Sequence, residues 1–239
     1  MTRDLVYGRR PVRELLRGPR DALELWATER ALAAETWLRA ESPVRVQVKL
    51  DRDLAEAAGT RDHQGVLAWC EPYRYADAHG LAGGDRPLIV CLDQVSDPHN
   101  LGAVCRAVDG AGASGVVLPS HGSARVTAAV CRASAGAVEH VAVAVVTNLA
   151  RYLADVKGPD LWVYAASAEE GAAPMWDADL AGGAALVLGA EGRGLRPLVR
   201  KTCDAAVSIP LAGRVESLNV SVAAAVLLYE AARQRRETS

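Results

Sequence analysis

The sequence predicts an α/β protein whose main domain, residues 87–239, has a mostly parallel sheet with helices on both faces. The first observation is that short apolar runs alternate with helix-like segments throughout this range, which is typical of strands buried on both faces. The second is that residues 1–75 mix helical and alternating patterns, which predicts a small mixed α/β domain. The third is the segment EPYRYADAHGLAGGDRP at 71–87, where proline and glycine recur without apolar periodicity. We expect residues 76–86 within it to be a linker.

The N-terminal elements follow from local patterns. Residues Val12–Leu16 and Ala22–Ala40 have the composition of helices. Residues Val44–Leu50, VRVQVKL, alternate apolar and polar side chains as a half-buried strand does, and Gly65–Trp69 is a second short strand. Together these elements predict a small mixed α/β domain over residues 1–75.

Six apolar runs predict the strands of the main domain, and helical segments begin near residues 101, 125, 149 and 218. The runs are LIVCLD (88–93), GVVLP (115–119), VAVAVV (141–146), LWVYAAS (161–167), AALVLG (184–189) and AAVSIP (205–210). Ligands of such sheets bind at the carboxyl ends of the strands. We therefore expect the site in the segments that follow LIVCLD, LVLG and VSIP.

Length and composition set the broad class. The 239 residues are 50% hydrophobic and 23% charged, which is typical of a globular chain with a proper core. No charge-free run reaches the ~18 apolar residues that a membrane span needs, and the N-terminus lacks the apolar segment of a secretion signal. We expect a cytoplasmic protein that does not enter a membrane.

Cysteines and histidines give no sign of a metal site. The five cysteines are odd in number, widely spaced and mostly set in apolar stretches, so we interpret them as small buried hydrophobes. The five histidines stand singly, and the chain has no H-E-x-x-H, G-x-S-x-G, C-x-x-C or P-loop motif. We expect no metal cofactor.

Positive charge is concentrated in two segments although the formal net charge is only −2. Residues 1–20 contain six arginines against Asp4 and Glu14, and residues 193–214 contain four arginines and a lysine against Asp204. Two basic patches would suit a polyanion held at two places. The charge pattern is explained equally well if both segments are simply solvent-exposed faces of an arginine-rich protein.

The segment after the first strand reads DQVSDPHNLGAVCRAVDGAGASG. Asn100 is a suitable N-cap for a helix whose apolar stripe faces the sheet. Gly102 and Arg106 lie one turn apart on another flank of this helix. Arg106 would then project beside Gly102, which has no side chain and leaves room for another group to approach closely. A capped helix with a solvated arginine explains the pattern equally well.

The other two strand ends carry glycines and small polar residues. Gly189, Gly192 and Gly194 interrupt the second junction, where backbone amides can approach a ligand, and Glu191 lies inside that loop. At the third, Ser217 is placed to cap a helix whose first turn also carries Asn219. This helix is apolar nearly all round over residues 220–228, which predicts burial within one subunit or at the interface of a homodimer.

Together, DPHNLGAVCRA (97–107), LVLGAEGRGL (186–195) and SIPLAGRVESLNVSVAAA (208–225) resemble the three signature motifs of the SpoU branch of the SPOUT RNA ribose 2′-O-methyltransferases. Their order and spacing make the resemblance specific. VYGRRPVRELL near the start and DHQGVLA at 62–68 are similar to the N-terminal substrate-binding domain of that family. The resemblance covers essentially the whole chain, and it is strongest with the members that methylate a guanosine of bacterial 23S rRNA.

The resemblance implies a trefoil knot near the C-terminus, dimerisation through the knot region and S-adenosylmethionine as the cofactor. It also implies site residues. The catalytic motif positions fall on Asn100, Arg106, Glu191, Ser217 and Asn219. Backbone contacts to the cofactor fall on Gly189, Ile209 and Leu218. One departure is Glu216, which stands where relatives often have a small polar residue.

The chemistry agrees with these residue types. Methyl transfer from a sulfonium to a ribose 2′-hydroxyl needs in-line alignment and help in removing the hydroxyl proton. A guanidinium holds its protons too firmly to be a good base, so we interpret Arg106 first as a clamp on the substrate phosphate and only second as the base. The other four catalytic positions would hold the loops and the ribose in register.

Alternative functions remain at this stage. The same chemistry could act on a tRNA loop, or the chain could be a non-catalytic RNA-binding module that has kept the fold. The intact Asn100, Arg106, Glu191 and Asn219 disfavour a pure binder, which has no need of them. The expected partner is RNA in every case.

Overall fold

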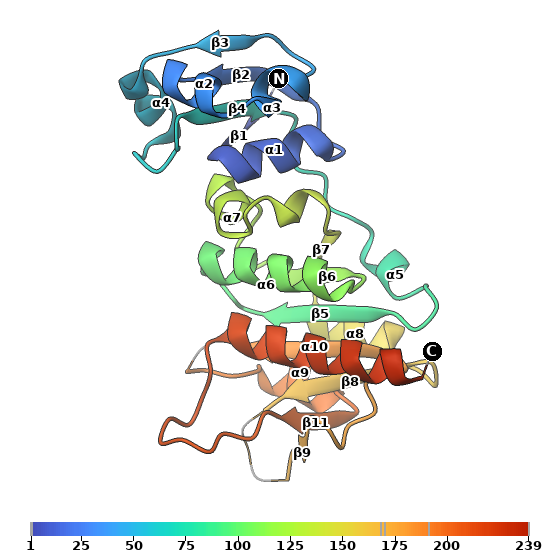
Figure 1. Ribbon diagram of the computed structural model, residues 1–239. Coiled ribbons are helices and arrows are strands. Elements are labelled where there is room, and N and C mark those ends of the chain that lie inside the picture. Colours follow the sequence, from blue (N-terminus) through green and yellow to red (C-terminus); the bar gives the residue numbers. More distant parts are fainter. Residues whose placement is uncertain (1, 168, 170, 191, 239) are drawn as a thin grey trace. The chain divides into compact units, whose positions relative to one another are not determined.

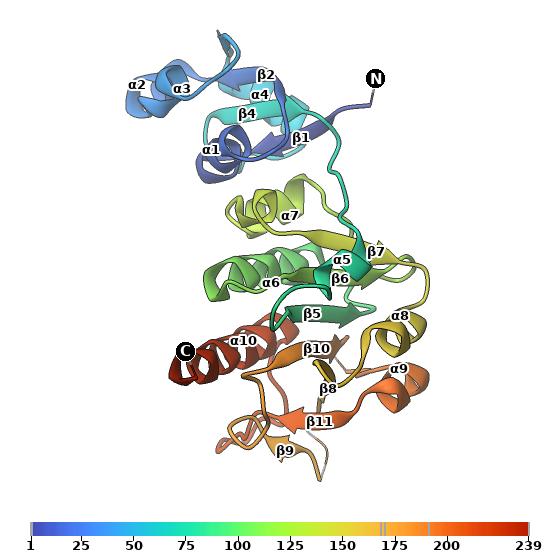
Figure 2. The same ribbon diagram turned by 90° about the vertical axis from the view of Figure 1, so that its right-hand side faces the viewer.

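The computed structural model describes residues 2–167, 169, 171–190 and 192–238, and the chain forms two compact units (Figures 1 and 2). The first unit combines Met1–Arg74 with Arg125–His140, and the second combines Tyr75–Ala124 with Val141–Ser239. The chain therefore passes between the units three times. Residues 125–140, which the sequence pattern assigned to the main domain, belong to the N-terminal unit.

The first unit is built on a four-stranded sheet in the order β1-β4-β2-β3. Strand β4 pairs antiparallel with β1 and β2, while β3 pairs parallel with β2. This mixed sheet with short helices agrees with the predicted N-terminal α/β domain. The elements are β1 (Asp4–Tyr7), α1 (Arg9–Arg17), β2 (Ala22–Ala27), α2 (Glu29–Ala34), α3 (Trp37–Ala40), β3 (Val46–Val48), α4 (Asp51–Ala58), β4 (Val66–Cys70), α7 (Ala128–Ala133) and a 3₁₀ turn, η1 (Ala137–Glu139).

The predicted helix over residues 22–40 is wrong in its first part. Ala22, Leu25 and Ala27 are buried in β2, where Leu25 pairs with Ala68 of β4. The residues of β2 are good helix formers, but pairing on both sides of the strand outweighs that preference. Thr28 then begins α2, because its side chain accepts a hydrogen bond from the amide of Ala31. Strand β1 was not predicted at all.

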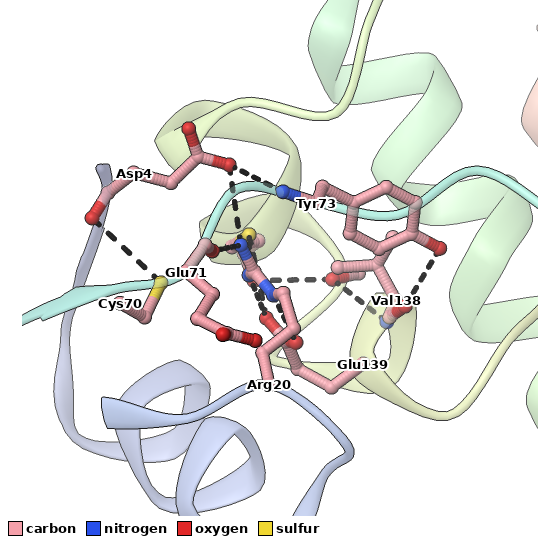
Figure 3. Close-up of polar contacts among 9 residues, drawn as sticks. Asp4, Arg20, Cys70, Glu71, Tyr73, Val138 and Glu139 are labelled. Atoms are coloured by element: carbon pink, nitrogen blue, oxygen red, sulfur yellow. Dashed lines mark hydrogen bonds and ion pairs between the residues drawn. The ribbon is translucent and has the colours of Figure 1, made fainter. Parts of the chain in front are cut away.

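A buried ion pair ties residues 125–140 to the rest of the first unit (Figure 3). Arg20 and Glu139 are each only 5% exposed. The Arg20 guanidinium contacts the Glu139 carboxylate at 2.5 Å and 2.9 Å, and it also donates to Asp4 and to the carbonyl of Glu71. Desolvation opposes the charge, but the hydrogen bonds that Arg20 donates to Glu139 outweigh it and raise the pKa of Arg20. The hydroxyl of Tyr73 donates to the carbonyl of Val138 and adds a second tie.

The second unit contains a seven-stranded sheet in the order β7-β6-β5-β10-β8-β11-β9. Every strand pair of this sheet among the described residues is parallel, which confirms the predicted fold class. Strand β10 enters between β5 and β8, so strands far apart in sequence meet at the centre. The strands are β5 (Leu88–Asp93), β6 (Gly115–Pro119), β7 (Val143–Val146), β8 (Leu161–Ala166), β9 (Ala173–Pro174), β10 (Gly183–Gly189) and β11 (Ala205–Ser208).

Helices cover both faces of this sheet (Figure 2). On one face α6 (Pro98–Ala111) and α10 (Val220–Glu237) pack against each other and against the strands. On the other lie α5 (Ala78–Leu81), α8 (Leu149–Val156) and α9 (Pro197–Thr202), whose apolar side chains form one core cluster with the strands. None of the described helices is both long enough and apolar enough to cross a membrane.

The segment predicted as a linker is a structured part of the second unit. The amide of Ala76 donates to the carbonyl of Val143, and the carbonyl of Ala78 accepts a bond from the hydroxyl of Tyr152. Asp77 caps α5 through its side chain. Gly83 and Gly84, which suggested a linker, lie in the short turn after α5.

Four of the five cysteines are buried, as the sequence predicted, and Cys203 is half-buried. Burial raises the pKa of the Cys70 and Cys105 thiols to about 12. These thiols therefore stay protonated and unreactive at neutral pH.

Candidate functional site

A cavity of about 330 Å³ opens at the carboxyl ends of β8, β10 and β11. Its walls come from the segments that follow these strands and from the start of α10. The described lining residues are mainly small and apolar, with Ser167, Glu216 and Ser217 as the polar side chains; the others are Ala166, Leu188, Gly189, Ala190, Gly192, Gly194, Val207, Ile209, Leu211, Leu218, Val220 and Ala223. Such a cavity suits a small molecule with a largely apolar part.

The loop after β10 folds back tightly on the strand that precedes it. A Cβ at Gly189 would lie 2.2 Å from the carbonyl carbon of Gly194, so no other residue fits there. Gly192 and Gly194 have φ of 75° and 63°, in the left-handed region that favours glycine. The amide of Gly194 donates to the carbonyl of Ala190 and closes the turn. Glu191, the predicted catalytic residue of this loop, lies outside the described residues.

An ion pair that the sequence analysis missed anchors the far end of this loop. Asp93, the last residue of β5, is 1% exposed and accepts hydrogen bonds from the amide and the Nε of Arg196 at 2.9 Å and 2.8 Å. A buried carboxylate needs such partners. Asp93 thus fixes the start of α9 and the loop that lines the cavity. An acidic residue at the end of an otherwise apolar strand is the signal that could have revealed it.

Asn100 and Asn219, from two different motifs, meet in the structure. The Nδ2 of Asn219 donates to the Oδ1 of Asn100 at 2.9 Å. Asn219 stands between Leu218 and Val220, which both line the cavity. The bond therefore joins the start of α6 to the start of α10 at the edge of the cavity.

The predicted helix caps are wrong, and their correction explains this contact. Asp97 caps α6 by accepting from the amide of His99, and Pro98 follows as the first helical residue. Asn100 is therefore inside the first turn, where its side chain is free to reach across. Asn219, instead of Ser217, caps α10 by accepting from the amide and hydroxyl of Ser221 at 2.9 Å and 2.6 Å.

The remaining predicted site residues fall into two groups. Gly189, Ile209, Ser217 and Leu218 all line the cavity. Arg106 does not line it, and its side chain is exposed on α6, where it makes no hydrogen bond or ion pair with any described residue. A free guanidinium of this kind is available to an external anion.

Acidic partners neutralise most of the first basic patch, residues 1–20. Five of the six arginines have acidic partners: Arg3 pairs with Glu24, Arg9 with Glu35, Arg13 and Arg17 with Glu41, and Arg20 with Glu139. Hydrogen bonds from Arg13 and then Arg17 lower the pKa of Glu41 to about 2. In the second patch Arg196 and Arg200 are paired, whereas Arg193, Lys201 and Arg214 are exposed and unpaired among the described residues.

A larger groove, of about 860 Å³, lies at the opposite ends of the strands. It is lined by the residues that precede β8 and β10 and by the first residues of β11, and its charged side chains are mostly acidic, including Asp160, Asp177 and Asp179. Both its position and its charge are unsuited to an anionic ligand of a parallel sheet. Among the described residues no group of histidines, cysteines and acids could hold a metal ion.

A parallel sheet whose glycine-lined cavity lies at the carboxyl ends of its strands defines a nucleotide- or cofactor-binding α/β protein. Comparison with known proteins refines this class. Residues 87–229 match the SpoU rRNA methylase family, and residues 5–76 match the RNA 2′-O ribose methyltransferase substrate-binding domain. The chain belongs to the SpoU rRNA methylase family.

Individual relatives are similar over nearly the whole chain. The 23S rRNA (guanosine-2′-O-)-methyltransferase RlmB of Shewanella oneidensis is 39% identical, with 98% of each chain covered. RlmB of Ralstonia nicotianae is 43% identical over 90% of this chain and 88% of its own. The crystal structure of the SpoU methyltransferase AviRb from Streptomyces viridochromogenes in complex with AdoMet has a TM-score of 0.83 at 26% identity, covering 98% of this chain and 91% of AviRb.

Proposed function

We propose that this protein transfers a methyl group from S-adenosylmethionine to the ribose 2′-hydroxyl of a guanosine in 23S rRNA. The observation that carries the proposal is the cavity at the carboxyl ends of β8, β10 and β11, with the Asn100–Asn219 bond at its edge. The names of the relatives from Shewanella oneidensis and Ralstonia nicotianae support the substrate. The reaction would take place in the cytoplasm, where ribosomal RNA is processed.

The cavity residues fit S-adenosylmethionine. Apolar side chains such as Ile209 and Leu218 can hold the adenine, and the glycines around Gly189 leave backbone amides and carbonyls open to it. When bound, the cofactor supplies an activated methyl group on a sulfonium. The carboxylate of Glu216 also lines the cavity, where it favours a positively charged ligand. The AdoMet complex of AviRb supports this assignment.

The residues around the cavity would position the ribose and its hydroxyl. The Asn100–Asn219 bond holds the starts of α6 and α10 together, and the cap that Asn219 forms fixes the first turn of α10. Ser217 lies on the cavity wall beside them. Alignment is the main requirement of an in-line transfer, so these groups act chiefly by fixing geometry.

Arg106 would bind a phosphate of the RNA. Its exposed guanidinium has no partner among the described residues and lies on the same helix as Asn100. A phosphate held there could accept or relay the proton that the 2′-hydroxyl loses, whereas the guanidinium itself is a poor base. Glu191 would complete the set of catalytic residues.

The active form would be a homodimer. Helix α10 buries Ala224, Leu227 and Leu228 inside its own subunit, so part of its apolar surface is already covered. Val222 and Tyr229, however, are 47% and 56% exposed on the outer side of the helix. A second copy of the chain packing there would remove this apolar surface from water.

Transfer of tritium from labelled S-adenosylmethionine tests the proposed function. Unmodified 23S rRNA, 16S rRNA and total tRNA are offered in parallel, and the labelled RNA is digested to nucleosides. The proposal expects 2′-O-methylguanosine from 23S rRNA alone. Label in tRNA would show that the proposed substrate is wrong, and label on a base would show that the proposed reaction is wrong. No label in any RNA would favour a non-catalytic RNA-binding module.

A further inference from the structure

The segment His63-Gln64-Gly65 forms a tight turn that the proposed reaction does not use. Gln64 and Gly65 both have positive φ, 55° and 76°. The amide of Val66 donates to the carbonyl of His63, and the carbonyl and side-chain oxygens of Gln64 accept from Arg9. A Cβ at Gly65 would lie 2.6 Å from the Oγ1 of Thr28. The turn is therefore fixed against α1 and the start of α2.

His63 has an unused hydrogen-bond donor. Its side chain is only 2% exposed, and its Nδ1 accepts from the amide of Gly65 at 3.0 Å. With Nδ1 acting as the acceptor, the neutral ring carries its proton on Nε2. That Nε2 is buried without a hydrogen-bond partner, since the nearest carboxylate oxygen, of Asp51, lies at 3.8 Å. A buried donor without a partner is costly and calls for a ligand.

His63 is also one of the residues that line an open cavity of about 400 Å³ within the first unit. The cavity is lined by His63 and by the arginines Arg9, Arg30 and Arg61, with Asp51 as the single acidic residue among the described lining side chains. Arg9 is paired with Glu35. Arg30 and Arg61 are exposed and make no side-chain hydrogen bond or ion pair with any described residue. They are thus free cations at the edge of the cavity.

We propose that this cavity is a phosphate-binding subsite for the RNA backbone, in which His63 Nε2 donates to a phosphate oxygen and Arg30 and Arg61 supply the charge. The inference rests on the proposed function, because it takes RNA as the ligand. A phosphodiester matches the site since its oxygens only accept hydrogen bonds, and the free polar groups here are donors apart from the Asp51 carboxylate. Asp51 lowers the affinity by repulsion.

The charge part of the subsite is tested with Arg30→Ala/Arg61→Ala in the full-length protein. Binding to fluorescein-labelled single-stranded oligouridine is followed by anisotropy at pH 8 over a series of KCl concentrations. Each phosphate contact on a single strand contributes about 0.7 to the slope of log K against log salt. The double variant should flatten the slope by about 1.4. The control Arg39→Ala/Arg45→Ala, which removes two exposed arginines of the same unit from outside the cavity, should leave it unchanged.

The hydrogen bond is tested with His63→Leu, which should weaken binding about tenfold with no change in slope, since a neutral donor releases no counterion. His63→Gln keeps an N–H donor and should recover most of the affinity, and Asp51→Asn should bind more tightly than wild type. If His63→Leu does not fold, the exposed pair Arg30 and Arg61 still decides the question.

Equal effects of the two arginine pairs, or no effect of either, would overturn the subsite. Loss of affinity for a 23S rRNA transcript with oligouridine binding unchanged would also overturn it, because it would show base recognition. Wild-type methyl transfer to the same transcript is measured in parallel. If that transfer is absent while the slope change is present, the proposed function fails and the phosphate subsite stands.

Discussion

The hydrogen bond between Asn219 and Asn100 offers a prediction that can be worked out in energy. Asn100→Ala removes one neutral hydrogen bond, which contributes about 1 kcal/mol to stability. Asn219→Ser removes the same bond but keeps an oxygen that can cap α10, so its cost is also about 1 kcal/mol. Asn219→Ala loses the cap as well, which adds about another 1 kcal/mol.

The double variant Asn100→Ala/Asn219→Ser should lose no more stability than either single variant, because each single change already removes the same hydrogen bond. The coupling energy is then about 1 kcal/mol. Urea unfolding followed by circular dichroism measures the free energies, and single-turnover methyl transfer is measured on the same proteins. Transfer should fall to a similar level in all three variants. Additive losses of stability, with no coupling, would refute the view that these two side chains act as one unit.

Three further predictions concern charge and assembly. Val222→Glu should convert a dimer to monomers in sedimentation equilibrium, whereas a wild-type chain that is monomeric at micromolar concentration would contradict the dimer. Arg20→Ala should lower the free energy of unfolding by about 3–5 kcal/mol by leaving the buried carboxylate of Glu139 unpaired, while Arg20→Met/Glu139→Leu recovers most of the loss; equal instability of the two would argue against the buried pair. Because the pKa of Glu41 is lowered from 4.5 to about 2, its stabilising effect is complete above pH 4.5 and disappears as the pH falls towards 2. The stability difference between wild type and Glu41→Gln should therefore close over that range, and a difference independent of pH would show that the ion pairs of Glu41 contribute nothing.

The sequence predicts the second unit well because its strands are buried on both faces. Runs such as LIVCLD and GVVLP contain almost no polar residue, so their burial and their parallel pairing follow directly from composition. The first unit is predicted poorly for the opposite reason. Strand β2 consists of helix-forming residues, and only its pairing with β4 and β3 determines its conformation.

The site is predicted at the level of segments but not of contacts. The strand-end rule selects the loops that carry Gly189, Ile209 and Leu218, because carboxyl ends meet at one edge of a parallel sheet. Caps were misplaced by a few residues, since Asp97 and Asn100 are equally good capping residues. Long-range ion pairs such as Asp93–Arg196 and Arg20–Glu139 join residues 103 and 119 positions apart. A local pattern can mark Asp93 as an acid at the end of an apolar strand, but it does not identify the distant partner in either pair.

These ion pairs also change how the N-terminal unit should be studied. Deleting residues 1–74 would leave Arg125–His140 without most of its partners and Glu139 without Arg20. Such a truncated chain would expose a buried carboxylate and apolar surface. Point substitutions in the full-length protein are therefore the better test of substrate recognition.

The central claim is that Arg106 binds RNA while a separate cavity binds the cofactor. The most direct test is Arg106→Ala, assayed for methyl transfer to 23S rRNA and, by calorimetry, for S-adenosylmethionine binding. Arg106 is absent from the cavity wall and free of partners among the described residues. The account predicts that transfer is abolished while cofactor affinity stays within a few-fold of wild type. Cofactor binding lost together with transfer, or transfer retained, would contradict it.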